Sequence, residues 1–338
     1  MRVGLCGLSH PHLPGRLAGW RAAGWEVTGG WDADPEQCRA FCRRHHVPPI
    51  EHPALLDPAV DLVVVDAWPD QACLLTADLL AAGKPVLLEK PGAPRASAFS
   101  VVAAAVRAGE QGGSRAWVQM GYHFRYSPAL TSLRAWLRAG AGGRLSLVRV
   151  HGGAPAGTLP TADWLRAGER GGLLFSLGCH WVDLALWLWG APLQVTCQLW
   201  RRSESPTARW GTEDGATAAW TYRDMLLTLE MSGWESRGYG DGWSIAVYGE
   251  RGEAVAELGP CTFRRSMPLP GLAVPAEGCR RWACTQQDLF AAEAKDVRTR
   301  LRQGRAPACD AAQGAAVLDL LEALYQAAES GRAVAVAP

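Results

Sequence analysis

Two patterns of apolar and polar positions divide the chain, and the first extends to residue 121. It alternates short apolar runs with stretches of helical periodicity, which is the order of a parallel sheet built from βαβ units. The run 61–66 is almost entirely valine and leucine, as expected of a strand covered on both faces. The predicted strands are 2–6, 26–31, 61–66, 85–88 and 116–120, and the predicted helices extend from the turn at residue 7 to residue 20 and over 35–45, 76–82 and 97–108.

From residue 122 the predicted strands are longer and alternate apolar with polar residues, as strands with one covered face do. They are 146–151, 194–201, 216–222 and 226–231, and a long amphipathic helix over 310–329 closes the chain. A chain of 338 residues is longer than one hydrophobic core usually organises. We therefore predict an α/β Rossmann domain over residues 1–121 and an α+β domain with a large, open, mainly antiparallel sheet over residues 122–338.

Charge and cysteine content narrow the class of protein. The chain has 34 Lys and Arg residues against 33 Asp and Glu residues, a net charge of +1, and its basic residues are scattered. This pattern does not favour a nucleic-acid partner. No run approaches about 18 uncharged apolar residues, and the first residues lack the form of an export signal, so we expect a cytoplasmic protein without membrane contact. The ten cysteines are irregularly spaced, which predicts free thiols.

One group of potential metal ligands lies in and just after the predicted helix 35–45. It consists of Cys38, Cys42, His45 and His46. The segment is rich in arginine and has no second ligand pair, so we predict no metal site there or elsewhere in the chain.

The first strand is followed by a turn that partly matches a dinucleotide-binding signature. Residues 7–12 read GLSHPH, where the full signature reads G-x-G-x-x-G. Gly7 permits the tight turn, and Ser9 is small enough for the backbone to approach a pyrophosphate at the helix N-terminus. His12 replaces the third glycine. The motif alone is as compatible with a plain βα turn as with a nucleotide site.

Asp32 strengthens the nucleotide interpretation because it ends the second predicted strand. A carboxylate there can accept hydrogen bonds from the adenosine ribose and repels a 2′-phosphate, so we expect NAD rather than NADP. The alternative is that Asp32 only caps the helix that begins at Pro35.

Glu89 and Lys90 follow the buried strand 85–88 directly. In open α/β sheets, ligands bind at the carboxyl ends of the strands. Burial there would disfavour the charged ammonium, which makes Lys90 a candidate general acid and base. The alternative is a Glu–Lys surface pair before the turn at Pro91.

A polar stripe crosses the otherwise apolar segment 176–187. Helical spacing would place Ser176, His180, Asp183 and Trp187 on one face. His180 could polarise or deprotonate a substrate hydroxyl, with Asp183 orienting it or binding a second hydroxyl. Alternatively, Ser176 is a helix N-cap and His180 a hydrogen-bonded core residue.

Polar and aromatic residues near the expected domain junction are candidates for substrate contact. Tyr122, His123 and Arg125 follow the last strand of the first domain, although Arg125 could instead tie the two domains together. The chain has 16 tryptophans, most of which we expect in the core or an oligomer interface. Four could stack on a sugar or a nicotinamide: Trp164, Trp181, Trp187 and Trp234.

Several motifs, taken together and in this order, match a known family. They are Gly83-Lys84-Pro85-Val86 with Glu89-Lys90-Pro91, then Arg125-Tyr126-Ser127-Pro128-Ala129, then Gly171-Gly172 through Ser176, Gly178, His180 and Asp183 to Gly190, then Asp214, Gly249 and Gly252, and finally Gly331-Arg332-Ala333-Val334. From Val3 to near Val336 the chain therefore resembles the glucose–fructose oxidoreductase, inositol dehydrogenase and MocA-like dehydrogenases.

The resemblance implies a Rossmann domain and a sheet domain, an NAD cofactor, a sugar, inositol or related polyhydroxy substrate, and a homodimer or homotetramer formed through the open sheet. It also implies that Lys90 is the catalytic lysine, that His180 is the histidine of the family's Asp-x-x-x-His motif, and that Asp183 is the carboxylate one turn later. The residues expected at the cofactor are Gly7, Leu8, Ser9, His10, Asp32, Pro69, Glu89 and Lys90.

Several positions depart from the family pattern. Ser176 stands where the family has its catalytic aspartate, and a hydroxyl can only donate or accept a hydrogen bond there. Cys73 stands where a histidine is usual, and His123 where an asparagine is common. Ser9 and His12 replace two glycines of the nucleotide turn.

We therefore expect an NAD-dependent dehydrogenase or reductase that acts on CH–OH groups, with Lys90 and His180 handling the hydroxyl proton and Ser176 among the substrate contacts. Two alternatives stay open. One is a catalytically weak NAD-binding or ligand-sensing protein of the same fold. The other is a non-redox reaction in which bound NAD is recycled within each turnover.

Overall fold

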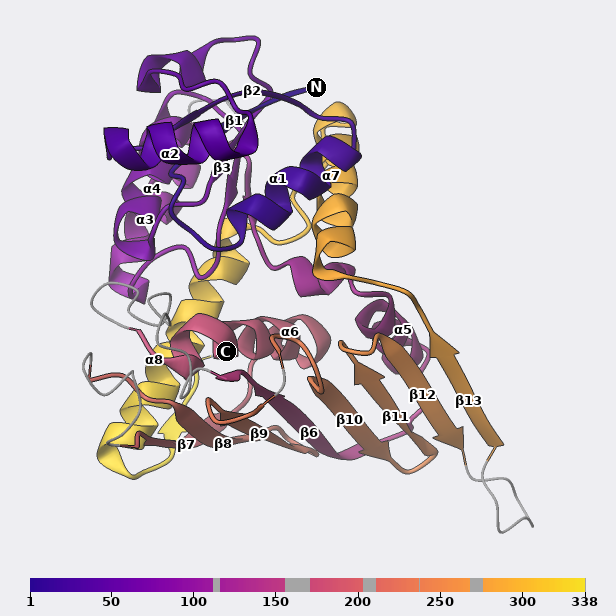
Figure 1. Ribbon diagram of the computed structural model, residues 1–338. Helices are drawn as coiled ribbons and strands as arrows, with labels where there is room; N and C mark the ends of the chain where they lie inside the picture. Colours follow the sequence, from indigo (N-terminus) through magenta and orange to yellow (C-terminus); the bar gives the residue numbers. More distant parts are fainter. Residues whose placement is uncertain (112–115, 156–170, 203–210, 237, 268–275, 338) are drawn as a thin grey trace. The chain divides into compact units, whose positions relative to one another are not determined.

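The computed structural model describes residues 1–111, 116–155, 171–202, 211–236, 238–267 and 276–337 (Figure 1). The chain divides into two compact units. The first contains Met1–His123 and Thr285–Asp319, and the second lies within Phe124–Arg166, Gly171–Cys284 and Leu320–Pro338. The expected boundary between residues 121 and 122 is close to the end of the first segment. The sequence pattern did not indicate that 285–319 returns to the first unit.

The first unit is built on a five-stranded parallel sheet in the order β2-β1-β3-β4-β5. Cys6 pairs with Trp31 and Val65, and Leu88 pairs with Val65 and Met120, so the carboxyl ends of all five strands share one edge. The strands are β1 (Arg2–Cys6), β2 (Glu26–Trp31), β3 (Leu62–Val65), β4 (Val86–Leu88) and β5 (Val118–Met120). They confirm the five predicted strands, the last three with shorter bounds.

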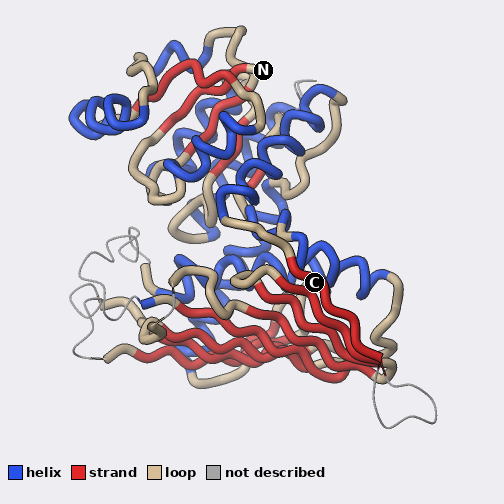
Figure 2. The backbone as a smooth tube through the Cα atoms, turned by 45° about the vertical axis from the view of Figure 1, so that its right-hand side comes forward, coloured by secondary structure: helices blue, strands red, loops and turns tan. Residues whose placement is uncertain are grey.

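Helices surround this sheet. They are α1 (Leu13–Ala22), α2 (Pro35–His45), α3 (Pro69–Ala81), α4 (Ala96–Gln111) and α7 (Gln286–Arg302), with 3₁₀ turns η1 (His52–Leu56) and η2 (His123–Tyr126). The helix predicted over 76–82 begins earlier, at Pro69, because proline suits the first turn of a helix. The unpredicted α7 packs against α1 (Figures 1 and 2). A capping box between Thr285 and Asp288 starts it.

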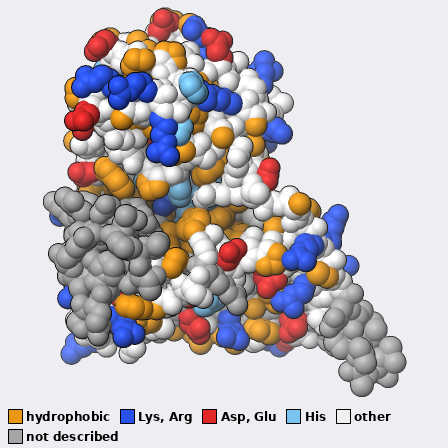
Figure 3. Space-filling model, viewed as in Figure 1, with side chains coloured by type: hydrophobic (Ala, Val, Ile, Leu, Met, Phe, Trp, Pro, Cys, Tyr) orange, Lys and Arg blue, Asp and Glu red, His pale blue; other side chains and the backbone are white. Residues whose placement is uncertain are grey.

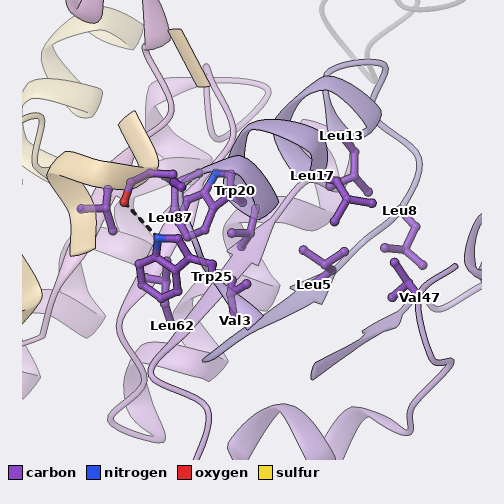
Figure 4. Close-up of a cluster of buried hydrophobic side chains, with 14 of the residues drawn as sticks. Val3, Leu5, Leu8, Leu13, Leu17, Trp20, Trp25, Val47, Leu62 and Leu87 are labelled. Atoms are coloured by element: carbon purple, nitrogen blue, oxygen red, sulfur yellow. Dashed lines mark hydrogen bonds between the residues drawn. The ribbon is translucent and has the colours of Figure 1, made fainter. Parts of the chain in front are cut away.

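The core of the first unit lies between β1, β3, α1 and α7. Val3 and Leu62 are fully buried, and Trp20 and Trp25 pack against each other beside them (Figure 4). The Trp25 indole N–H donates to the carbonyl of Ala294 in α7 at 3.0 Å, so the late helix is joined to the N-terminal core. Burial of such side chains stabilises the unit by roughly 1.5–3 kcal/mol each.

The second unit is built on a nine-stranded mixed sheet in the order β13-β12-β11-β10-β6-β9-β8-β7-β14. Only β6 and β9 pair in parallel; the other pairs among the described strands are antiparallel, which confirms the predicted mainly antiparallel sheet. The strands are β6 (Leu145–Gly153), β7 (Gln194–Trp200), β8 (Gly215–Thr221), β9 (Leu226–Ser232), β10 (Ser244–Gly249), β11 (Gly252–Glu257), β12 (Thr262–Met267), β13 (Ala276–Arg281) and β14 (Val334–Ala335).

Helices α5 (Pro128–Arg138) and α6 (Cys179–Trp189) lie on one face of this sheet (Figures 1 and 2). Buried and more exposed residues alternate along β7 and β9, as expected of a sheet with one covered face. The predicted closing helix is confirmed as α8 (Ala311–Ser330).

The segment that carries the predicted polar stripe is not one regular α-helix. Leu174–Gly178 forms a π-helical turn, η5, and α6 begins only at Cys179. Ser176 therefore lies in the π turn, whereas His180 and Asp183 lie in α6. The alternative that Ser176 caps the helix is wrong, because Gly178 is the N-cap of α6.

None of the described helices is long and apolar enough to cross a membrane. On the face drawn in Figure 3, Lys and Arg side chains are interspersed with acidic, hydrophobic and uncharged ones.

Candidate functional site

The turn after β1 has the geometry that only glycine allows. Gly7 has φ +76°, and a Cβ there would lie 2.5 Å from the Cβ of Ala67. The backbone N–H of Leu8 donates to Asp32 Oδ2 at 2.6 Å, and the Ser9 hydroxyl donates to the same oxygen at 3.3 Å. Asp32, at the end of β2, therefore holds the turn in place.

The alternative role for Asp32 as a helix cap is wrong. The N-cap of α2 is Asp34, whose carboxylate accepts from the backbone N–H groups of Glu36 and Gln37. Asp32 Oδ1 instead accepts from the backbone N–H of Asp34 at 2.9 Å.

The residues at this edge fit a dinucleotide. The strand order reverses between β1 and β3, and ligands of open α/β sheets bind at such a point. The Gly7 turn leads to the N-terminus of α1, whose positive dipole end favours an anion, and Asp32 supplies a carboxylate at the end of the adjacent strand. His12, where the signature has its third glycine, is the N-cap residue of α1.

A cluster of buried ions lies at the carboxyl ends of β3 and β4. Its centre is Arg16 of α1, which is 1% exposed. Arg16 Nη2 donates to Glu89, Nη1 donates to Glu293 of α7, and Nε lies 3.2 Å from Asp66 Oδ2. We call Arg16, Asp66, Glu89 and Glu293 the Arg16 cluster. It joins residues from α1, α7 and two strand ends.

The cluster borders the predicted catalytic lysine and two histidines of the nucleotide turn. Glu89 Oε1 lies 2.9 Å from His12 Nδ1, 3.8 Å from His10 Nδ1 and 3.9 Å from Lys90 Nζ. Lys90 is 5% exposed, so it is no surface partner of Glu89. The alternative of a Glu–Lys surface pair is therefore wrong.

His123 belongs to the same group of side chains. Its ring is 5.2 Å from that of His12 and 4.6 Å from that of Phe290, and its Nε2 lies 3.3 Å from Nε2 of Gln286. Burial and the neighbouring positive charges lower the pKa of all three histidines well below the usual value. They are His10, His12 and His123.

The carboxyl groups of the cluster are held in different states. Burial raises the pKa of Asp66 to about 8 and that of Glu293 to about 7, against the attraction of Arg16. Burial opposes ionisation of Glu89 too, but the positive potential of His10, Arg16 and Lys90 lowers its pKa. Glu89 is therefore the carboxylate of this group that keeps its charge most readily.

In the second unit, aromatic side chains surround His180. This residue is 1% exposed, and its Nε2 lies 3.2 Å from the hydroxyl of Tyr239. The Phe124 ring meets the imidazole edge-on with centroids 4.7 Å apart, and Tyr239 stacks on Phe124 at 6.0 Å. Trp243 completes the group, 5.0 Å from Tyr239. The hydroxyl–imidazole pair can exchange a proton or bind a substrate hydroxyl.

Asp183, in α6 with His180, forms a buried ion pair with Arg125. Arg125 donates from Nη2 to Asp183 Oδ1 at 2.6 Å and from Nε to Oδ2 at 3.0 Å. Both residues are in the second unit. The pair therefore joins η2 to α6 within the second unit.

The π turn before α6 is held by a buried glutamate. Glu213 Oε1 accepts from the Leu174 N–H at 3.0 Å and from the Tyr325 hydroxyl at 2.8 Å. Burial raises the pKa of Glu213 to about 7 against these hydrogen bonds. Ser176 follows in the same turn and is 6% exposed. Glu213 thereby positions the backbone that carries Ser176.

The other predicted residues have varied surroundings. Tyr122 is 1% exposed, and Pro69 is the first residue of α3. Trp181 packs against Trp243, and the Trp234 indole donates to Asp214 at 3.0 Å. Arg134 lies over the ring of Trp187, and Trp164 is outside the described residues.

Both halves of the chain match families of known proteins. Residues 1–114 match an oxidoreductase family with an NAD-binding Rossmann fold, and residues 130–255 match the GFO/IDH/MocA C-terminal domain. Inositol 2-dehydrogenase 1 of Saccharopolyspora erythraea is 30% identical over 99% of this chain and 94% of its own length. The chain belongs to the GFO/IDH/MocA family of oxidoreductases.

Other relatives and solved structures agree with this assignment. Inositol 2-dehydrogenase of Acidothermus cellulolyticus is 27% identical over 93% of this chain and 88% of its own length. Levoglucosan dehydrogenase, solved with NADH and levoglucosan, matches over 100% of both chains with TM-score 0.88 and 16% identity. An oxidoreductase of Agrobacterium radiobacter, solved with NAD+, L-tartaric acid and magnesium, covers 99% of this chain and 98% of its own with TM-score 0.83 and 19% identity. The expected fold and NAD cofactor are confirmed.

Four residues of this GFO/IDH/MocA protein escaped the sequence interpretation. Arg16 lies on the same helical face as Leu13 and Trp20. Glu293 lies on the same face as Leu289 and Val297. A charged residue within an apolar stripe is a signal that could have identified both. Glu213 and Tyr239 lie outside the regular helices and strands and carry no comparable signal.

Proposed function

We propose that this GFO/IDH/MocA oxidoreductase is a dehydrogenase that transfers a hydride between NAD and a secondary carbinol carbon of a sugar, an inositol or a related polyhydroxy compound. The observation that carries the proposal is the burial of Lys90. This lysine is 5% exposed at the carboxyl end of β4, next to Glu89 of the Arg16 cluster. A lysine buried at that edge of a parallel sheet is placed for proton transfer.

In the first unit the Gly7 turn and Asp32 would hold the dinucleotide, which supplies the hydride acceptor or donor when bound. Lys90 would take the hydroxyl proton during oxidation and return it during reduction. Glu89, fixed by Arg16 through one oxygen, presents its other oxygen 3.9 Å from Lys90 Nζ and so limits where the amine can lie.

In the second unit His180 and Tyr239 would bind and polarise hydroxyl groups. The imidazole and the phenol each donate and accept hydrogen bonds, which suits an alcohol on one side of the reaction and a ketone on the other. The Arg125–Asp183 pair would offer further hydrogen bonds to neighbouring hydroxyls. Ser176 offers a hydroxyl rather than a carboxylate, so proton transfer would rest on Lys90 and His180.

The names of the relatives support this substrate class. They include inositol 2-dehydrogenases, a myo-inositol dehydrogenase of Streptomyces leeuwenhoekii and the trans-1,2-dihydrobenzene-1,2-diol dehydrogenase of Sus scrofa. Inositols, sugars and cyclic diols share a ring with adjacent hydroxyl groups. A substrate screen should begin with such compounds.

The proposal is tested with Lys90→Met. Turnover of the best substrate should fall by about 10²- to 10⁴-fold, the usual contribution of an acid–base residue. The affinity for NADH, measured by energy transfer from tryptophan to the reduced nicotinamide, should change by less than about threefold.

Lys295→Met is the matched control, because Lys295 is an exposed lysine of the same unit, and it should behave as the parent protein. If Lys90→Met and the parent protein turn over at equal rates, the role assigned to Lys90 is wrong. If neither NADH nor NADPH binds the parent protein, the dehydrogenase proposal itself fails.

We also propose that two copies associate through the exposed face of the nine-stranded sheet. Trp200 of β7 is 41% exposed and Leu226 of β9 is 40% exposed, and the strand register places both side chains on that face. Sedimentation velocity of the parent protein and of Leu226→Glu tests this. A monomeric parent protein would contradict it.

A further inference from the structure

Three side chains at the carboxyl edge of the first unit's sheet form a cluster of metal-binding atoms. His10 and His12 come from the turn after β1, and Glu89 follows β4. One ligand atom of each lies within 4.8 Å of those of the other two. Nothing in the proposed hydride transfer requires histidines in this turn.

The separations suit a tetrahedral ion. Zinc binds imidazole nitrogen and carboxylate oxygen at about 2.0–2.1 Å, so two ligand atoms of a tetrahedral site are about 3.3 Å apart. Glu89 Oε1 lies 2.9 Å from His12 Nδ1 and 3.8 Å from His10 Nδ1, on either side of that value. Small side-chain rotations would equalise the two distances.

His10 Nδ1 can bind an ion as it stands, whereas His12 must move its ring proton from Nδ1 to Nε2, because Nδ1 donates to Glu89 Oε1 at 2.9 Å. The backbone N–H of His12 donates to His10 Nδ1 at 3.2 Å, so this nitrogen carries its lone pair, and coordination would replace that hydrogen bond. Arg16 engages Oε2 of Glu89, whereas both histidines approach Oε1. Glu89 can therefore keep its partner Arg16 while Oε1, which also lies 3.9 Å from Lys90 Nζ, binds an ion.

Asp66 provides a second, independent observation. It is completely buried, and neither carboxylate oxygen accepts a hydrogen bond from any residue that the structure describes, although Arg16 Nε lies 3.2 Å from Oδ2. Its other oxygen, Oδ1, lies 3.9 Å from His10 Nδ1. A buried carboxylate oxygen without a donor, beside two histidines and a glutamate, is what a fourth ligand would look like.

The ligand set identifies the class of ion. We propose that His10, His12 and Glu89 bind one divalent transition-metal ion of the zinc class, with Asp66 beside the remaining position. Two imidazoles and carboxylates favour zinc or cobalt over magnesium or calcium, which prefer oxygen ligands alone.

The experiment uses the full chain, stripped with a chelator and titrated with Co²⁺. One equivalent should produce the visible absorption bands of tetrahedral cobalt, and Zn²⁺ should displace it. His12→Gln and His10→Asn should each weaken Co²⁺ binding by about 100-fold or more, because each removes a ligand.

Two controls separate this site from others. His46→Asn removes an exposed histidine whose left-handed backbone conformation asparagine tolerates, and it should bind Co²⁺ as the parent protein does. Cys38→Ser/Cys42→Ser should also bind normally. A thiolate-to-cobalt absorption band, or loss of binding in the cysteine variant, would overturn the proposal.

X-ray absorption of the zinc-loaded parent protein keeps the test decisive if the histidine variants do not fold. A spectrum that shows imidazole scattering and nitrogen or oxygen atoms bound to zinc supports the site. A spectrum that shows sulfur atoms bound to zinc contradicts it. If the parent protein binds no Co²⁺, the 2.9 Å contact between His12 and Glu89 is a hydrogen bond only and the proposal is wrong. Metal binding is measured without NAD or substrate, so its outcome is independent of the proposed dehydrogenase activity.

Discussion

A buried glutamate in each unit shows how differently the two regions accommodate negative charge. Glu89, in the first unit, is surrounded by His10, Arg16 and Lys90, and their positive potential lowers its pKa despite burial. Glu213, in the second, accepts hydrogen bonds from a backbone N–H and a tyrosine hydroxyl, and burial raises its pKa to about 7. The positive neighbours of Glu89 outweigh its desolvation, and the neutral donors of Glu213 do not. Arg16 does not outweigh desolvation at Glu293, whose pKa burial also raises to about 7.

The same contrast separates the two predicted proton-handling residues. Lys90 lies in a region of ions, next to Glu89 and the Arg16 cluster. His180 lies among aromatic rings, with a phenol at its Nε2. The first region depends on charge pairing for its stability, and the second depends on packing and hydrogen bonds. Substitutions in the two regions should therefore differ in size and in their dependence on pH.

The largest effect is expected from Arg16→Met. It leaves three buried carboxyl groups without their guanidinium, and the free energy of unfolding should fall by about 3–5 kcal/mol. Urea denaturation measures this.

Arg300→Met is the matched control in the same unit. It breaks a partly exposed pair with Asp296, 2.6 Å long, and should cost less than about 1 kcal/mol. If the free energy of unfolding falls equally in the two variants, the Arg16 cluster stabilises the fold no more than the partly exposed pair does.

Glu213→Gln should change the dependence of stability on pH. Because the pKa of Glu213 rises from its ordinary value of 4.5 to about 7 on folding, the parent protein loses stability as pH rises through that interval. The variant has no such group, so between pH 4.5 and pH 7 its free energy of unfolding should fall by about 3 kcal/mol less than that of the parent.

Denaturation at a series of pH values gives the free energy of unfolding of each protein as a function of pH. The difference between the two slopes does not depend on any pH-independent loss of stability that the amide causes. Glu253→Gln, at an exposed position of β11, should leave the slope unchanged. Parallel curves for Glu213→Gln and the parent protein would contradict the assigned pKa shift.

The smallest effect is expected from Tyr239→Phe. It removes the hydroxyl 3.2 Å from His180 Nε2 and keeps the ring that stacks on Phe124. The loss of one hydrogen bond should lower kcat/KM by about 3- to 10-fold without loss of stability. Tyr222→Phe, which removes a hydroxyl bonded to the Gly190 carbonyl, is the control and should leave kcat/KM unchanged. A parent-like kcat/KM in Tyr239→Phe would exclude its hydroxyl from the reaction.

Local pattern was sufficient for much of the fold. The runs that became β1, β2 and α2 were predicted with their observed bounds, because apolar periodicity and proline or glycine punctuation depend on near neighbours. The π turn at Leu174–Gly178 was missed, since it has the same apolar composition as an α-helix. The return of α7 to the first unit was missed because an apolar stripe predicts that a helix face is buried but not which unit it packs against.

The sequence by itself determined the family, the Rossmann and sheet architecture, the NAD cofactor and the position of Lys90 after a buried strand. Those features follow from short-range pattern and from motifs in order along the chain. Only the tertiary structure decided which charges meet. Arg16 and Glu293 are 277 residues apart, and Tyr239 is 59 residues from His180. Ion pairs and hydrogen bonds act over a few ångströms in space, and a single sequence does not specify which distant residues approach that closely.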